Sequence, residues 1–153
     1  MINSTSSLGE RQFSFETSSL EQTSEVGSKI ASMLSFPCCV FLIGDLGAGK
    51  TSLVKSVINS LGYAGDVTSP TYNLIQEYQV EQGMVYHMDL YRLEDPSELE
   101  FLGLEDLWTE RSMFLIEWPE KGEGFLQSAN IEIRLNKLFD SSPNHRNIVL
   151  KYV

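Results

Sequence analysis

The stretch GDLGAGKTS, from Gly44 to Ser52, contains the residue types that chemistry on a phosphate group requires. Its spacing matches G-x-x-x-x-G-K-[ST], in which glycines let backbone N–H groups approach phosphate oxygens and the following helix offers its positive end. Lys50 would neutralise the β- and γ-phosphates, and the Thr51 hydroxyl would ligate magnesium. The sequence therefore predicts a nucleoside triphosphate site. Its predicted binding residues are Gly44, Asp45, Leu46, Gly47, Ala48, Gly49, Lys50, Thr51 and Ser52.

The base of the nucleotide is predicted from the other nucleotide-reading motifs. A GTPase of the Ras type normally reads guanine through N-K-x-D, whereas NKLFD at 136–140 has its aspartate one residue too late. No convincing D-x-x-G switch follows a strand either. ATP is therefore favoured over GTP.

An enzyme with such a loop needs a second acid at the end of a neighbouring strand, to hold magnesium or to orient water. MFLIEW supplies Glu117 after four apolar residues, and MVYHMDLYR supplies Asp89. We expect Lys50, Asp89 and Glu117 to form the catalytic set, with Thr51 and Glu117 as metal ligands. The alternative for either acid is that it caps a helix or pairs with Arg92.

Three further positions carry open alternatives. The loop TSPT contains Ser69 and Thr71, which are either a γ-phosphate sensor or ordinary turn residues around a proline. His87 lies two residues before Asp89, so both share one face of a strand, where a core histidine is more typical than a base. Trp118 is expected to pack rather than react.

Hydrophobic periodicity predicts the elements that position these residues. Strands are expected over 12–17, 38–43 and 113–118, a hairpin over 71–80 and 84–93, and two antiparallel strands at a sheet edge over 130–138 and 146–153. A first helix, capped by Ser18 or Ser19 and with Leu20 facing the core, is expected to end at about residue 34. Two further helices are expected, one over 50–61 and one after Pro96. The order indicates an α/β fold: a single-domain, three-layer P-loop NTPase-like sandwich with a mixed, partly antiparallel sheet. Residues 1–11 are expected as a flexible tail and 12–153 as the nucleotide-binding domain.

Charge and cysteine content limit the partners and the compartment. The net charge is −10, and 89–123 holds eleven acidic residues against three basic ones. A protein that binds nucleic acid alone usually carries a basic stripe, so we expect contact with nucleic acid only through a partner. Cys38 and Cys39 are adjacent and are predicted to be core residues on opposite strand faces. No apolar run spans a bilayer and no secretory signal begins the chain, so we expect a cytoplasmic protein without membrane contact.

Five segments, in this order and spacing, resemble the TsaE (YjeE) family of small bacterial P-loop ATPases. They are GDLGAGKTS, TSPTYNLIQEY, HMDLYRL, ELEFLGLED and LIEWPEKG. The resemblance runs from Val40 to Gly122, over half of the chain. Ser52 stands where the family often has a second threonine.

The resemblance implies a function in the threonylcarbamoyladenosine modification of tRNA. TsaE-like proteins hydrolyse ATP with magnesium and act on a complex of TsaB and TsaD, which modifies the adenosine next to the anticodon. By position, Thr51 and Glu117 would ligate magnesium, Lys50 would hold phosphates, Asp89 would serve hydrolysis, and the loop from Ser69 to Thr71 would be a nucleotide-sensitive switch. Intrinsic hydrolysis is expected to be slow and stimulated by the partner.

Two other functions use the same loop. A small-molecule kinase usually closes an arginine-bearing lid over the phosphate, but Arg92 and Arg111 are isolated in an acidic stretch. A nucleotide-dependent docking switch would bind without significant hydrolysis.

Overall fold

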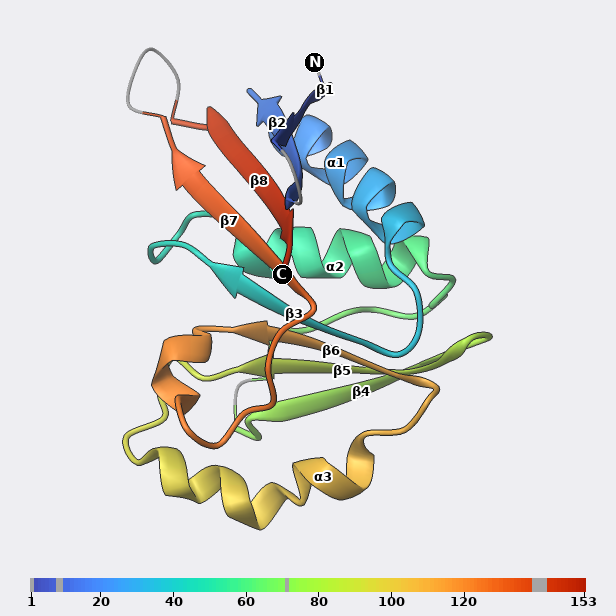
Figure 1. Ribbon diagram of the computed structural model, residues 1–153, viewed down its shortest axis with the longest axis vertical. Helices are drawn as coiled ribbons and strands as arrows, with labels where there is room; N and C mark the ends of the chain where they lie inside the picture. Colours follow the sequence, from blue (N-terminus) through green and yellow to red (C-terminus); the bar gives the residue numbers. More distant parts are fainter. Residues whose placement is uncertain (1, 8–9, 71, 139–142) are drawn as a thin grey trace.

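Eight strands form one mixed sheet in this computed structural model, which describes residues 2–7, 10–70, 72–138 and 143–153 (Figure 1). In chain order they are β1 (Ile2–Ser7), β2 (Glu10–Thr17), β3 (Cys38–Ile43), β4 (Ile75–Val80), β5 (Gly83–Asp89), β6 (Ser112–Glu117), β7 (Ile131–Lys137) and β8 (Arg146–Tyr152). Their order across the sheet is β1-β2-β8-β7-β3-β6-β5-β4.

The centre of the sheet is parallel and its two sides are antiparallel. Strand β3 pairs in parallel with both β6 and β7, and β6 pairs in parallel with β5. The sequences CCVFLI and SMFLIE fill the central strands β3 and β6, and every residue of β6 is buried. Near-continuous apolar runs are typical of strands covered on both faces. The predicted mixed α/β sheet is therefore confirmed.

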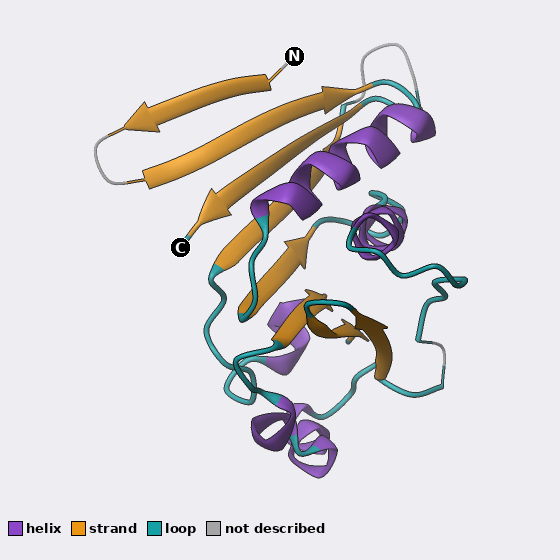
Figure 2. Ribbon diagram, turned by 90° about the vertical axis from the view of Figure 1, so that its right-hand side faces the viewer, coloured by secondary structure: helices purple, strands orange, loops and turns teal. Residues whose placement is uncertain are grey.

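Helices cover both faces of the sheet. One apolar cluster joins one sheet face to α1 (Leu20–Met33) and α2 (Lys50–Ser60). A second cluster joins the other face to the 3₁₀ helix η1 (Pro96–Leu102), to α3 (Leu104–Leu107) and to the loop after the 3₁₀ helix η2 (Pro119–Gly122). Figure 2 shows α1 and α2 together along the sheet, with the short helices apart from them. The layers are helix, sheet, helix, as predicted.

Helix α1 begins where the sequence predicts. Ser19 is its N-cap, and the Ser19 hydroxyl accepts a hydrogen bond from the Gln22 N–H at 3.1 Å. The prediction that Leu20 faces the core is wrong, because its side chain is 69% exposed at the first helical position. Ile30 is fully buried and packs against the sheet.

Two expectations about the strands differ from the structure. β7 and β8 are antiparallel, as predicted, but they lie inside the sheet, since β8 also pairs with β2. Within residues 1–11, where the sequence predicts a tail, β1 pairs with β2. Strand pairing uses main-chain groups, so a polar segment such as INSTSS gives little hydrophobic signal for it.

Candidate nucleotide and metal site

The glycine loop connects the end of β3 to the start of α2, at the carboxyl edge of the parallel strands. Gly47 and Gly49 have positive φ angles of 76° and 101°, which the absence of a Cβ allows. A Cβ on Gly44 would lie 2.6 Å from the Leu135 carbonyl oxygen on β7, so only glycine fits there. The Ala48 N–H donates to the Asp45 carbonyl at 3.0 Å and closes the turn. Asp45, Leu46, Gly47 and Ser52 are exposed.

Lys50 is the first residue of α2, and its side chain turns back into the loop. Its ammonium donates to the Gly44 carbonyl and, at 3.1 Å, to the Asp45 carbonyl. The ammonium also lies 4.0 Å from the centre of the Trp118 ring, a cation–π distance. Burial lowers the pKa of Lys50, and nearby carboxylates, chiefly Glu117, oppose that shift. Lys50 therefore places its amino group at the centre of the loop.

Thr51 and Glu117 are in direct contact. The Thr51 hydroxyl donates to Glu117 Oε1 at 2.9 Å and lies 3.2 Å from Oε2. Glu117 is the last residue of β6 and only 2% exposed, while Thr51 lies in the first turn of α2. The structure thus brings together the two residues that the sequence predicts as metal ligands.

Asp89 is paired in register with Glu117 across β5 and β6. It is half-buried, and its Oδ1 accepts a hydrogen bond from the Tyr91 N–H at 3.0 Å. Burial raises the pKa of Asp89, and the Glu117 carboxylate raises it further, although the Tyr91 N–H opposes this. The alternative in which Asp89 pairs with Arg92 has no support among the described contacts.

His87 also reaches this site. The His87 side chain is fully buried, and its Nε2 lies 2.6 Å from Glu117 Oε2. The expectation of a core histidine is correct as to burial, but it missed this carboxylate contact. The pairing of β5 with β6 brings His87 close to Glu117, and no motif within either strand predicts that contact.

The segment between α2 and β4 contains the residues predicted to form a nucleotide-sensitive switch. Ser69 is half-buried there, and Thr71 lies outside the described residues. Next to Ser69, the Thr68 main chain is held at both its N–H and its carbonyl by the Tyr78 hydroxyl, at 3.0 and 2.9 Å. The role of Ser69 and Thr71 stays a prediction.

Two basic residues missed by the sequence analysis contact the loop. Arg146, at the start of β8, donates from Nε to the Ala48 carbonyl at 3.0 Å. Lys137, at the end of β7, approaches the Leu46 carbonyl with its Nζ at 3.5 Å. Parallel pairing of β7 with β3 brings Lys137 to the loop, and antiparallel pairing of β8 with β7 places Arg146 beside Lys137. The hydrophobic pattern alone does not reveal these pairings.

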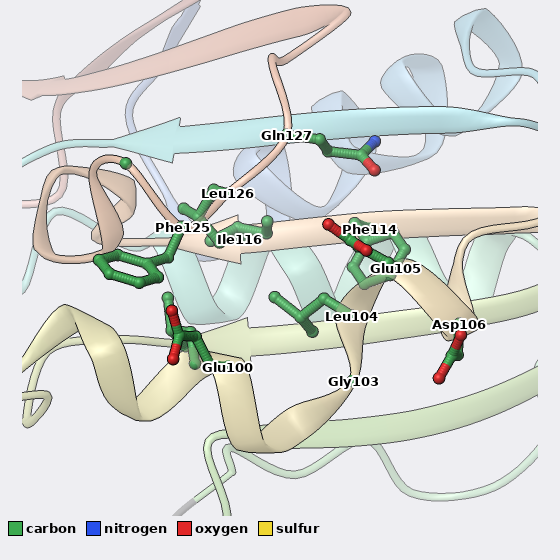
Figure 3. Close-up of a pocket in the computed structure, with 12 residues that line it drawn as sticks. Glu100, Gly103, Leu104, Glu105, Asp106, Phe114, Ile116, Phe125, Leu126 and Gln127 are labelled. Carbon is green, nitrogen blue, oxygen red and sulfur yellow. The ribbon is translucent and has the colours of Figure 1, made fainter.

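A cavity of about 600 Å³ lies on the other face of the sheet (Figure 3). Phe114 and Ile116 of β6 line it, and their side chains belong to the apolar cluster opposite α2. Side chains alternate along a strand, so Glu117 points away from this cavity. The cavity is therefore separate from the glycine loop.

The donor set near the loop fits magnesium in one specific way. Within the described parts of the chain, no group of three or more His, Cys, Asp or Glu side chains could hold a metal. Thr51 and Glu117 offer oxygen ligands, which magnesium prefers, and magnesium is usually held by one or two carboxylates together with substrate phosphates and water. A magnesium ion here would thus be bound jointly with a nucleotide.

A central parallel strand, a G-x-x-x-x-G-K-T loop and a following helix define an α/β protein of the phosphate-binding-loop class by sequence and arrangement. The family model described as threonylcarbamoyl adenosine biosynthesis protein TsaE matches residues 17–148. The chain belongs to the TsaE family.

Relatives at substantial identity support this membership. The chain is 49% identical over 111 residues to the tRNA threonylcarbamoyladenosine biosynthesis protein TsaE of Haemophilus influenzae, covering 72% of this chain and 68% of that protein. It is 34% identical over 130 residues to the Bacillus subtilis protein of the same name, covering 85% and 81%. The crystal structure of Bacillus subtilis YdiB superposes with a TM-score of 0.74 at 28% identity, covering 96% of this chain and 89% of that one.

Within the described residues, no helix is long and apolar enough to cross a membrane.

Proposed function

We propose that this protein is a magnesium-dependent ATPase that acts on a TsaB–TsaD-type complex and sustains formation of the threonylcarbamoyl group on the tRNA adenosine next to the anticodon. The contact between Thr51 and Glu117 carries the proposal, because it joins the glycine loop to a strand-end carboxylate. Membership of the TsaE family supports the pathway, since its relatives are named for tRNA threonylcarbamoyladenosine biosynthesis.

Each residue of the site has a distinct part in this proposal. The loop N–H groups and Lys50 bind the phosphates of ATP, and Thr51 and Glu117 hold the magnesium ion. Magnesium bound there would neutralise charge on the β- and γ-phosphates. Asp89, beside Glu117 at the strand ends, orients the attacking water and accepts its proton.

The acidic surface supports a protein as the direct partner, with tRNA reached only through it. Residues 89–123 include the end of β5, η1, α3, β6 and η2. This acidic stretch holds eleven acidic and three basic residues, and so most of the net charge of −10. Exposed carboxylates there include Glu94, Asp95, Glu98, Glu100, Glu105 and Asp106. Such a surface repels the phosphates of nucleic acid and favours a basic protein surface.

The test is steady-state ATP hydrolysis with magnesium, measured for the protein alone and with the purified TsaB–TsaD pair. We expect slow hydrolysis alone and strong stimulation by the pair. Glu117→Gln should abolish the stimulated activity and partly spare nucleotide binding. Glu81→Gln, which removes an exposed carboxylate in the turn between β4 and β5 and outside the acidic stretch, is the matched control and should hydrolyse ATP as the wild type does.

Three outcomes would contradict the proposal. Normal turnover by Glu117→Gln would refute the site assignment. Transfer of phosphate to a metabolite in place of water would indicate a small-molecule kinase. Tight partner binding that needs ATP but proceeds without hydrolysis would indicate a docking switch.

A further inference from the structure

His87 makes one polar contact in the buried interior next to the glycine loop. Its side chain is 0% exposed, and its Nε2 lies 2.6 Å from Glu117 Oε2. The other ring nitrogen, Nδ1, is buried and has no hydrogen-bond partner among the described residues. Polar side chains buried in this way normally have a partner for each group, so the single contact to Glu117 needs an explanation.

The sheet places His87 and Glu117 on the same face. Asp89 pairs with Glu117 across β5 and β6, and His87 lies two residues before Asp89. Residues two apart on a strand share a face, and Val85 on this face packs in the cluster that contains α2. The imidazole therefore contacts the Glu117 carboxylate from the neighbouring strand β5, while the Thr51 hydroxyl contacts it from α2.

The two oxygens of Glu117 differ in their contacts. Both lie within hydrogen-bond distance of the Thr51 hydroxyl, Oε1 at 2.9 Å and Oε2 at 3.2 Å, but among the described contacts only Oε2 meets His87 Nε2. A carboxylate held at one oxygen has a restricted rotation, so its second oxygen points in a defined direction. That direction is toward Thr51 and the start of α2.

The contact also defines the direction of the hydrogen bond. An ionised carboxylate only accepts hydrogen bonds, so Nε2 carries a proton and donates it to Oε2.

We propose that His87 is a positioning residue that holds Glu117 Oε2 and thereby directs Oε1 toward the metal that Thr51 shares. The inference rests on the proposed function, because it assigns Glu117 to magnesium. Hydrogen-bond partners of metal-ligating side chains orient those ligands, and their loss typically costs about 10–100-fold in metal affinity or activity. In this proposal His87 acts through Glu117 and is not itself a ligand of the metal or the nucleotide.

The test measures ATP affinity by calorimetry with and without magnesium, and the ratio of the two is the magnesium effect. His87→Leu removes the donor at similar size, and we expect it to reduce the magnesium effect about tenfold while leaving metal-free ATP affinity within about twofold. His87→Gln places an amide N–H near the Nε2 position and should restore most of the effect. His87→Asn places its amide near Nδ1, too short to reach Glu117, and should behave as His87→Leu.

Met88→Leu is the matched control. Met88 is fully buried on the same strand and packs on the opposite face of the sheet, so its substitution disturbs the core without touching Glu117. We expect an unchanged magnesium effect. If His87→Leu does not fold, the comparison of His87→Gln with His87→Asn decides the question.

The outcomes separate this inference from the proposed function. A full magnesium effect in His87→Asn or His87→Leu would overturn the positioning role alone. The same would follow if His87→Gln lost the effect as completely as His87→Asn. A wild-type protein that binds ATP without any magnesium effect would overturn the proposed function, and the inference with it.

Discussion

Asp89 and Glu117 occupy paired positions at the ends of the neighbouring parallel strands β5 and β6. The two carboxyl groups share the sheet face that α2 covers, with Lys50 and His87 close by. Two acids on adjacent strand ends are electrostatically coupled, and burial adds to the cost of charging both. The consequences of this arrangement can be measured.

Asp89→Asn is expected to raise stability and lower hydrolysis. The folded-state pKa of Asp89 is raised above its ordinary 3.8 by burial, so the fold favours the protonated form. That stabilisation is complete below pH 3.8 and is lost as pH rises through the folded pKa. At neutral pH, Asp89→Asn should therefore melt at a higher temperature than wild type, with the gap closing below pH 3.8 in melting curves recorded across pH.

Asp95 provides the matched control for this pH dependence. Its pKa is lowered by hydrogen bonds from Ser97 at the start of η1, so its contribution is present above the ordinary 3.8 and lost as pH falls. Asp95→Asn should give no gain at neutral pH and leave hydrolysis unchanged. A loss of stability in Asp89→Asn at neutral pH would contradict the conclusion that burial disfavours the charged form of Asp89.

Thr51→Val tests the contribution of the hydroxyl group, because valine keeps the shape of the side chain and lacks the hydroxyl. Valine removes the donor to Glu117 Oε1, and the expected cost is about 1–2 kcal/mol in unfolding free energy, as for other lost buried hydrogen bonds. Magnesium-dependent ATP hydrolysis should fall at least about tenfold. Thr51→Ser keeps the hydroxyl and should retain most of both. Equal activity in the two variants would show that the hydroxyl is not a ligand.

Arg146→Met should loosen the glycine loop. The variant removes the donor to the Ala48 carbonyl, and we expect ATP affinity to fall several-fold, or by about 1 kcal/mol, without a change in the magnesium effect. Lys137→Met should have a smaller effect, because its contact with Leu46 is longer, at 3.5 Å. Arg134→Met is the control, since Arg134 lies on β7, is exposed, and pairs with Glu132. Calorimetric titration with ATP distinguishes the three variants.

The two cysteines should be chemically inert in the folded protein. Burial raises the pKa of Cys38 to about 11 and that of Cys39 to about 12, so almost no thiolate is present at pH 8. Neither thiol should react with iodoacetamide under native conditions, and both should react after unfolding in denaturant. Mass spectrometry before and after denaturation reads out the label. Rapid native labelling would mean that the start of β3 opens easily.

The glycine loop, its flanking strand and helix, and the acids Asp89 and Glu117 could be predicted from the sequence. Each is a local pattern: a spaced motif, a continuous apolar run, or an acid that directly follows such a run. The cysteines illustrate the same principle. Cys38 and Cys39 were expected on opposite faces because side chains alternate along a strand, and they lie in the two separate apolar clusters.

Contacts between strands decided the remaining features of the fold and of the site. The amino-acid sequence alone predicted which residues could carry phosphate and metal chemistry, since that prediction depends on residue type and local spacing. Only the tertiary structure placed Arg146 and Lys137 on the loop, β8 inside the sheet, and His87 against Glu117. Pairing order and register join residues that are distant in the chain, and no local periodicity encodes which strands become neighbours.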